Sequence, residues 1–119
     1  MTIILVQRNN VVLRHLKQMV EECYPGSTIA AFSSAEEAIE MIKTSRQQID
    51  LCFTEILING RPSGFRIVEE LRRRNRWAKA VLIARDKDYA LEAWRIPVND
   101  YLIEPLTIES IRHAQISCK

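Results

Sequence analysis

The sequence has few aromatic residues, no long apolar run and little net charge. These shortages argue against an aromatic core, a membrane-spanning segment and a nucleic-acid-binding surface, respectively. Aromatic residues make up 7% of the 119 residues, so we expect a core built mainly from aliphatic side chains. The apolar run Ile3–Val6 near the start is far too short to span a bilayer, and we find no signal peptide. The formal net charge of +2 gives no indication of a nucleic-acid-binding surface. We therefore expect a protein with no membrane association.

Repeats, low-complexity tracts and linkers are also missing. The length suits one domain with a single core, so we assign residues 1–119 to one domain. The cysteines, Cys23, Cys52 and Cys118, are odd in number and widely spaced, which argues against a disulfide framework or a zinc site. We expect reduced thiols in a cytoplasmic protein, with Cys52 as a small core residue.

Short apolar runs alternate with amphipathic stretches about five times along the chain. The runs are continuous and rich in β-branched residues, which is the pattern of strands buried on both faces of a sheet. We predict strands over Thr2–Val6, Thr28–Phe32, Leu51–Thr54, Ala80–Ala84 and Tyr101–Ile103.

Between these runs the apolar residues recur at helical spacing, which predicts five helices with one buried face each. The pairs Ser33–Glu36 and Ser34–Glu37 both have capping-box spacing, and Thr107 is a candidate N-cap of the last helix. The apolar faces consist of Leu13, Leu16, Val20 and Cys23; Ala35, Ala38, Ile39 and Ile42; Phe65, Ile67, Val68 and Leu71; Tyr89, Ala90, Ala93 and Trp94; and Ile108 and Ile111.

The resulting order, with strands and helices alternating five times, predicts an α/β fold with a doubly wound, five-stranded parallel sheet. In such a sheet the ligand site lies at the carboxyl ends of the strands, near the point where the strand order reverses. The candidate site residues are those that end the predicted strands: Gln7, Arg8, Glu55, Ala84, Arg85 and Glu104.

Two parts of the sequence carry a family resemblance that covers essentially the whole chain. Asp50–Ile56, followed by Gly60 and Ser63-Gly64-Phe65, resembles the D-L-x-x-x-D-I-x-M-P-G-x-D/S-G pattern of response regulator receiver domains. Ala84–Trp94 and Asp100–Leu106 are similar to the T-A-x-x-x-Y-A-L-x-A-F and D-Y-L-x-K-P segments of receivers that precede LytTR-class DNA-binding domains. The resemblance implies a CheY-like, flavodoxin-like (βα)5 fold with the strand order 2-1-3-4-5.

The resemblance also implies a phosphorylation pocket, and every key position of that pocket departs from the family pattern. Receivers use an aspartate as phosphoacceptor, where this chain has Glu55, and an acidic pair that holds Mg²⁺, where it has Gln7 and Arg8. The Ser or Thr that binds the phosphoryl oxygen is replaced by Ala84, and the Lys that pairs with it is replaced by Glu104. The chemistry of a working receiver is therefore in doubt here.

Other parts of the family pattern remain. Tyr101 is the aromatic residue that receivers often use as a rotamer switch, and Pro105 is a position where we expect a cis peptide bond. The turn after Glu55 carries what looks like one extra residue, with Asn59 where proline is usual.

We expect Mg²⁺ binding to be lost or weak, so we predict no cofactor, no metal site and no catalytic residue. A hard divalent cation requires several oxygen ligands, whereas Gln7 supplies a neutral oxygen and Arg8 a fixed positive charge. One hypothesis is that the Arg8 guanidinium neutralises Glu55, Glu104 or both, and that Glu55 partly mimics a phospho-aspartate and locks one signalling state. The alternative is that the pocket has drifted and these residues are solvated surface charges.

The function that we predict is that of an atypical receiver, or pseudo-receiver. It would be a regulatory protein–protein interaction module that works without phosphorylation in signal transduction and transcription regulation. We expect a protein partner or a homodimer, bound through the fourth predicted helix, the fifth strand and the fifth helix, with Tyr89, Trp94 and Tyr101 at the interface. DNA would be bound only by a C-terminal domain that this chain does not contain. The alternatives are a receiver still phosphorylated in an unusual pocket, and a domain that senses a small anion through Arg8 and Arg85.

Two further features have ordinary structural explanations. The run Arg72-Arg73-Arg74, with Arg76 nearby, predicts the solvated end of a helix. His15 and His113 are far apart and lack the spacing of metal ligands, so we expect both at the surface.

Overall fold

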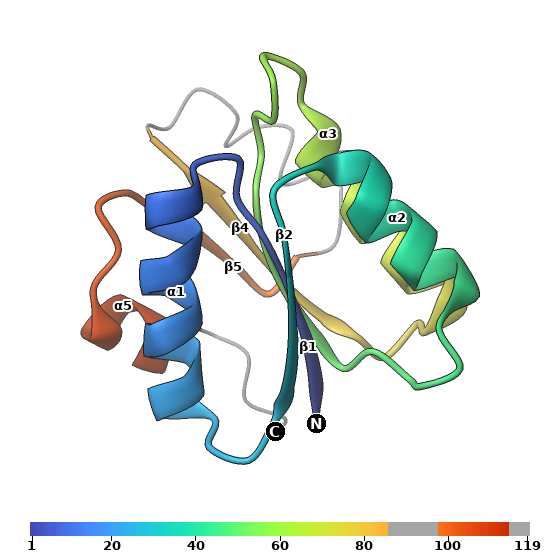
Figure 1. The fold of residues 1–119 in the computed structure, drawn as a ribbon, viewed down its shortest axis with the longest axis horizontal. Coiled ribbons are helices and arrows are strands. Elements are labelled where there is room, and N and C mark those ends of the chain that lie inside the picture. Colours follow the sequence, from blue (N-terminus) through green and yellow to red (C-terminus); the bar gives the residue numbers. More distant parts are fainter. Residues whose placement is uncertain (86–97, 115–119) are drawn as a thin grey trace.

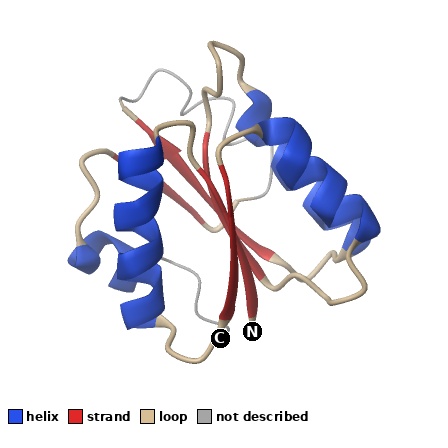
Figure 2. Cartoon of the chain, in the orientation of Figure 1, coloured by secondary structure: helices blue, strands red, loops and turns tan. Residues whose placement is uncertain are grey.

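A computed structural model describes residues 1–85 and 98–114 of the chain. It has a central sheet with helices on both faces: α1 and α5 cover one face, and α2 and α3 cover the other (Figure 1). The elements are β1 Thr2–Val6, α1 Asn10–Cys23, β2 Thr28–Phe32, α2 Ala35–Thr44, β3 Leu51–Glu55, α3 Ser63–Arg74, β4 Lys79–Ala84, β5 Asp100–Ile103 and α5 Ile108–Arg112 (Figure 2).

The sheet is entirely parallel, and its strand order is β2-β1-β3-β4-β5. Val6 at the end of β1 pairs with Thr54, and Glu55 at the end of β3 pairs with Ile83. The carboxyl ends of the strands therefore lie side by side along one edge of the sheet. This arrangement confirms the predicted fold class and strand order.

Helix starts follow the capping residues of the sequence. The Asn9 side chain accepts hydrogen bonds from the peptide nitrogens of Val11 and Val12 at the start of α1. Ser34 caps α2 by accepting from the peptide nitrogen of Glu37 at 3.2 Å, which selects one of the two predicted capping pairs. Thr107 caps α5 as predicted, with Ser110 as its capping-box partner.

The start of α3 lies directly against the end of β3. The peptide nitrogen of Gly64 donates to the carbonyl oxygen of Ile56 at 3.0 Å. A Cβ atom on Gly64 would meet the Glu55 carbonyl oxygen and would lie 2.8 Å from the Ile56 Cα, closer than real Cβ contacts allow. Glycine is thus required for α3 to approach the strand that carries Glu55.

The core consists of aliphatic layers on the two faces of the sheet. The predicted apolar faces of α2 and α3 are buried throughout. Cys52 is fully buried in β3, and burial raises the pKa of its thiol to about 12. His15 and His113 are exposed, as predicted. The fourth predicted helix, with Tyr89 and Trp94, lies outside the described residues.

The arginine run at the end of α3 is not solvated throughout: the prediction was wrong for Arg72, which is partly buried, whereas Arg73 and Arg74 are exposed as predicted. Arg72 donates to the Asn99 side-chain oxygen at 3.2 Å, and burial lowers the pKa of its guanidinium. Arg74 donates to the carbonyl oxygens of Lys43, in the last turn of α2, and of Ser45, which caps that helix. Both side chains tie neighbouring segments together. Arg72 reaches the segment before β5, and Arg74 binds carbonyl groups at the end of α2, which lack helical partners and attract a cation. Within the described ranges, no helix has the length and apolar character needed to cross a membrane.

Candidate functional site

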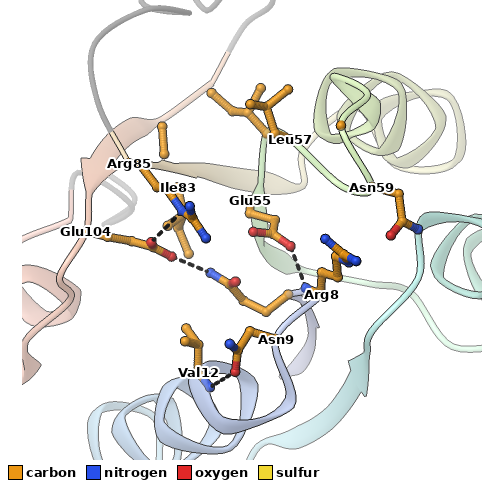
Figure 3. Close-up of a pocket in the computed structure, with 13 residues that line it drawn as sticks. Arg8, Asn9, Val12, Glu55, Leu57, Asn59, Ile83, Arg85 and Glu104 are labelled. Atoms are coloured by element: carbon orange, nitrogen blue, oxygen red, sulfur yellow. Dashed lines mark hydrogen bonds and ion pairs between the residues drawn. The ribbon is translucent and has the colours of Figure 1, made fainter.

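A pocket of about 430 Å³ opens at the carboxyl ends of β1, β3, β4 and β5 (Figure 3). All five positions at which the sequence departs from the receiver pattern line this pocket. They are Gln7, Arg8, Glu55, Ala84 and Glu104, and Arg85 lines the pocket with them. Parallel strand register brings them together from segments up to 97 residues apart.

The Gln7 side chain, just after β1, bridges the pocket to Glu104, just after β5. This side chain is almost completely buried, with 1% of its surface exposed. The Gln7 side-chain nitrogen donates to Oε1 of Glu104 at 3.2 Å. A buried amide requires a partner, and the Glu104 carboxylate supplies one.

Glu55 is held by the backbone at the end of β1. The peptide nitrogen of Arg8 donates a hydrogen bond to Oε1 of Glu55 (Figure 3). Glu55 is half-buried, and burial raises the pKa of its carboxyl group above the ordinary value. The Arg8 hydrogen bond opposes this rise, the Glu104 charge adds to it, and the charges of Arg85 and Arg8 oppose it. Because burial has the largest effect, this carboxyl group is easier to protonate than a solvated glutamate.

The predicted ion pair between the Arg8 guanidinium and a pocket carboxylate is not formed among the described residues. Arg8 contacts Glu55 through its peptide nitrogen, while its side chain is exposed and lies toward the Asn59 rim (Figure 3). The cation beside Glu104 is instead Arg85, whose Nε lies 4.0 Å from Glu104 Oε2. Arg8 is the second residue after β1, and there its peptide nitrogen, not its long side chain, faces Glu55 at the end of β3.

The remaining predicted residues flank the pocket. Ala84 is partly buried at the end of β4 and offers only a methyl group to the pocket. Tyr101 is partly buried and packs against the apolar cluster that contains Ile56 and Phe65. The Glu104–Pro105 peptide bond is cis, as expected. The roles of Tyr101 and Pro105 as a switch stay predictions.

A short hairpin forms the rim of the pocket between β3 and α3. Ile58 and Arg61 exchange backbone hydrogen bonds of 2.8 and 3.2 Å around Asn59 and Gly60. Both central residues have positive φ, 54° and 75°, which makes this a type I′ turn. From the sequence we predicted only a turn with one extra residue here and missed the hairpin, although Asn-Gly is a strong signal for one. Leu57, Asn59 and Gly60 also line the pocket.

Comparison with known families identifies the domain. The family model of the response regulator receiver domain matches residues 3–115. This chain belongs to that family. It is a receiver domain of two-component signalling, and receiver domains are typically regulatory and not enzymes. A search of the curated proteins found no significant match.

Solved receiver structures share the fold. A response regulator receiver protein from Sinorhizobium medicae WSM419 is 25% identical, with a TM-score of 0.79 over 96% of this chain and 90% of that one. A two-component response regulator from Clostridium difficile is 27% identical, with a TM-score of 0.76 over 92% and 88%. The receiver domain of a Pseudomonas aeruginosa PAO1 sensor histidine kinase, with magnesium coordinated in its active site cleft, is 17% identical, with a TM-score of 0.76 over 93% and 90%.

Proposed function

We propose that this receiver domain is a pseudo-receiver, which regulates other proteins by direct contact and does not use phosphorylation as its input. The observation that carries the proposal is the hydrogen bond between Gln7 and Glu104. These residues occupy the positions of a metal-binding acid and of the phosphate-pairing lysine in the resembled receivers. Here the two side chains satisfy each other, so the polar floor of the pocket is complete without a phosphoryl group.

The side chains present do not fit a magnesium ion. Mg²⁺ prefers an octahedral set of oxygen ligands with at least one or two carboxylates. Glu55 already accepts a hydrogen bond from the Arg8 peptide nitrogen, and Gln7 directs its amide nitrogen toward Glu104. The described residues contain no group of three or more His, Cys, Asp or Glu side chains that could hold a metal ion.

The other pocket residues also disfavour phosphoryl transfer. Glu55 is one methylene longer than aspartate, which displaces the attacking oxygen. The methyl group of Ala84 cannot donate a hydrogen bond to a phosphoryl oxygen. Glu104 places negative charge where transition-state charge would need a cation.

A fixed pocket of this kind supports one constant arrangement of the surrounding loops. The segment after β1 is joined to β3 by the Arg8–Glu55 hydrogen bond and to β5 by the Gln7–Glu104 hydrogen bond. The guanidinium of Arg8 has no part in these links, so the proposed lock differs from the ion-pair cluster predicted from sequence. The backbone of Arg8 and the side chain of Gln7 connect the strand ends instead.

The proposed partner is a second copy of the chain, which would make the domain a cytoplasmic homodimer. We assign this contact to the surface of β5 and α5, and from the sequence alone to Tyr89 and Trp94, which lie outside the described residues. Ile103 on β5 is an exposed large apolar residue, which supports a protein-binding surface. DNA would then be contacted through a separate LytTR-class domain.

Amide NMR spectra of the domain with and without Mg²⁺ and beryllofluoride, a mimic of the phosphoryl group, test this proposal. We expect unchanged resonances for Glu55, Ala84 and the adjoining loops. A variant with Gln7→Asp, Arg8→Asp, Glu55→Asp, Ala84→Thr and Glu104→Lys restores the receiver side chains and serves as the positive control. Shifts centred on Glu55 in the unaltered chain would instead support a receiver that is still phosphorylated in an unusual pocket.

A small anion is a second candidate input. The exposed guanidinium of Arg8 at the pocket rim, which has no ion-pair partner among the described residues, favours this alternative. Titration with inorganic phosphate, followed by the same NMR spectra, distinguishes anion sensing from the proposed pseudo-receiver function. Saturable shifts at Arg8 that disappear in Arg8→Gln would support anion sensing, and linear or absent shifts would exclude it.

A further inference from the structure

The small net charge of the chain conceals a strong separation of charge. Residues 43–50 and 72–79 contain seven of the 17 Lys and Arg residues but only one of the 15 Asp and Glu residues. These two segments therefore carry a formal charge of +6, which leaves −4 for the remaining 103 residues and +2 in total. The two segments are called the basic loop pair below.

The basic loop pair forms one continuous surface, although its halves are about 30 residues apart in sequence. Arg74 bonds to the Lys43 and Ser45 carbonyl oxygens, and the Asn75 side chain donates to the Ile49 carbonyl oxygen at 3.0 Å. The Lys79 peptide nitrogen donates to the Asp50 carbonyl oxygen at 2.9 Å. Both loops precede strands, so they lie at the end of the sheet opposite the pocket (Figure 1).

Trp77 stands at the centre of the second loop with most of its surface in water. It is 74% exposed, and the Arg76 guanidinium lies 5.2 Å from the centre of its ring. The Asn75 side chain accepts a hydrogen bond from the Trp77 peptide nitrogen at 3.0 Å, which fixes the backbone of the loop. An indole that is mostly exposed and has an arginine over one face can stack with a further planar group.

The charge pattern favours a polyanion as the occupant of this surface. Lys43, Arg46 and Arg76 are exposed, whereas Arg73 is paired with Glu70 of the same helix. Asp50, the one acid within the two segments, accepts a hydrogen bond from the Thr2 peptide nitrogen at 2.8 Å. Trp77 is the one large apolar side chain exposed in these two fully described loops. Protein interfaces usually bury a larger apolar centre, whereas single-stranded nucleic acids need only an aromatic platform beside a line of cations.

We infer that the basic loop pair binds single-stranded nucleic acid, with a base stacked on Trp77 and phosphates paired with the exposed Lys43, Arg46 and Arg76. This activity is separate from the pocket and does not depend on the proposed pseudo-receiver function. It would give the receiver domain its own weak, sequence-tolerant contact with nucleic acid.

Fluorescence of the full chain carrying Trp94→Phe tests this inference, because Trp77 is then its sole tryptophan. The probe is oligothymidylate of about 12 nucleotides in about 50 mM salt. We expect saturable quenching of Trp77 emission and an affinity that falls as salt is added. With a dye-labelled oligonucleotide, Trp77→Ala should weaken binding roughly 5- to 100-fold, in line with the loss of one stacked base.

Matched charge variants distinguish binding at the basic loop pair from non-specific electrostatic attraction of the oligonucleotide to the protein. Arg76→Gln and Lys43→Gln should each weaken binding severalfold, whereas Arg14→Gln and Lys17→Gln on the exposed face of α1 remove the same charge and should have little effect. Three outcomes would overturn the inference: no binding at low salt, unchanged binding in Trp77→Ala, or equally tight binding of polyglutamate of the same length. The last result would indicate an acidic protein segment as the occupant.

Discussion

The Gln7 side-chain nitrogen lies 3.2 Å from Oε1 of Glu104, so a buried amide just after β1 and a carboxylate just after β5 form one hydrogen-bonded pair across the pocket. Glu104 also has the Arg85 guanidinium nearby, at 4.0 Å from its other oxygen. The carboxylate thus accepts one hydrogen bond from Gln7 and forms an ion pair with Arg85, which comes from a different strand end. Its contribution should be measurable by changing each partner in turn.

Gln7→Glu should destabilise the domain at neutral pH. The substitution keeps the shape of the side chain but places a second carboxylate against Glu104 in a buried position. We expect a loss of about 1–3 kcal/mol in the free energy of unfolding. Urea denaturation at about pH 7 and about pH 5 measures the effect, which should shrink at the lower pH because one carboxyl group of the pair becomes protonated. Gln18→Glu on the exposed face of α1 is the matched control. Equal stability of the two variants would contradict the buried pair.

Glu55 should make the folded state less stable as pH rises. Burial raises the pKa of its carboxyl group above the unfolded value, so the folded state holds the proton more tightly. Between the unfolded and the folded pKa, the folded state binds more protons, and the free energy of unfolding falls with increasing pH. The difference in stability between the unaltered chain and Glu55→Gln should therefore shift in favour of the unaltered chain as pH falls from about 7 toward about 4. A difference that does not change with pH would show that the carboxyl pKa is not raised.

Gly64→Ala should disrupt the junction between β3 and α3. The added methyl group would collide with backbone atoms of Glu55 and Ile56, which cannot move without displacing the strand. We expect a loss of about 2–3 kcal/mol in urea denaturation. Ser63→Ala, one residue earlier at the start of the same helix, should change stability by less than about 0.5 kcal/mol. Similar effects of the two variants would mean that the close approach is not rigid.

Arg74 and Arg73 should behave differently although they are neighbours of the same type. Arg74→Met removes the hydrogen bonds to the Lys43 and Ser45 carbonyl oxygens and should cost about 1–2 kcal/mol. Arg73 is 72% exposed and pairs only with Glu70 on the same helix, so Arg73→Met should cost less than about 0.5 kcal/mol. Thermal unfolding of both variants gives the comparison. Equal losses would show that the contact between α2 and α3 does not depend on Arg74.

Much of the fold was predictable because parallel strands buried on both faces leave continuous apolar runs. The predicted strand Thr2–Val6 agrees with β1, and Leu51–Thr54 is one residue shorter than β3, because the pairing continues through Glu55. The convergence of Gln7 and Glu104 was predictable for the same reason, since the carboxyl ends of parallel strands share one edge. The sequence order of the elements was therefore enough to assemble the pocket.

The direction of individual side chains was not predictable in the same way. Whether the guanidinium or the peptide nitrogen of Arg8 would face Glu55 depends on loop geometry that no sequence period encodes. The separated charges of the basic loop pair were hidden because a contact such as that between Asn75 and Ile49 joins loops from different parts of the chain. Tyr89 and Trp94 lie outside the described residues, so their place at an interface stays a prediction.

The hairpin between β3 and α3 forms one wall of the pocket, and its length can change without a change in the sheet. Ile58 and Arg61 bond to each other, and Gly64 bonds separately to Ile56, so the turn closes on itself before the helix is anchored. Residues inserted or deleted around Asn59 and Gly60 would lengthen or shorten the wall without shifting strand register or helix position. Loop grafting at this turn could therefore change which molecules reach Glu55 and leave the scaffold intact.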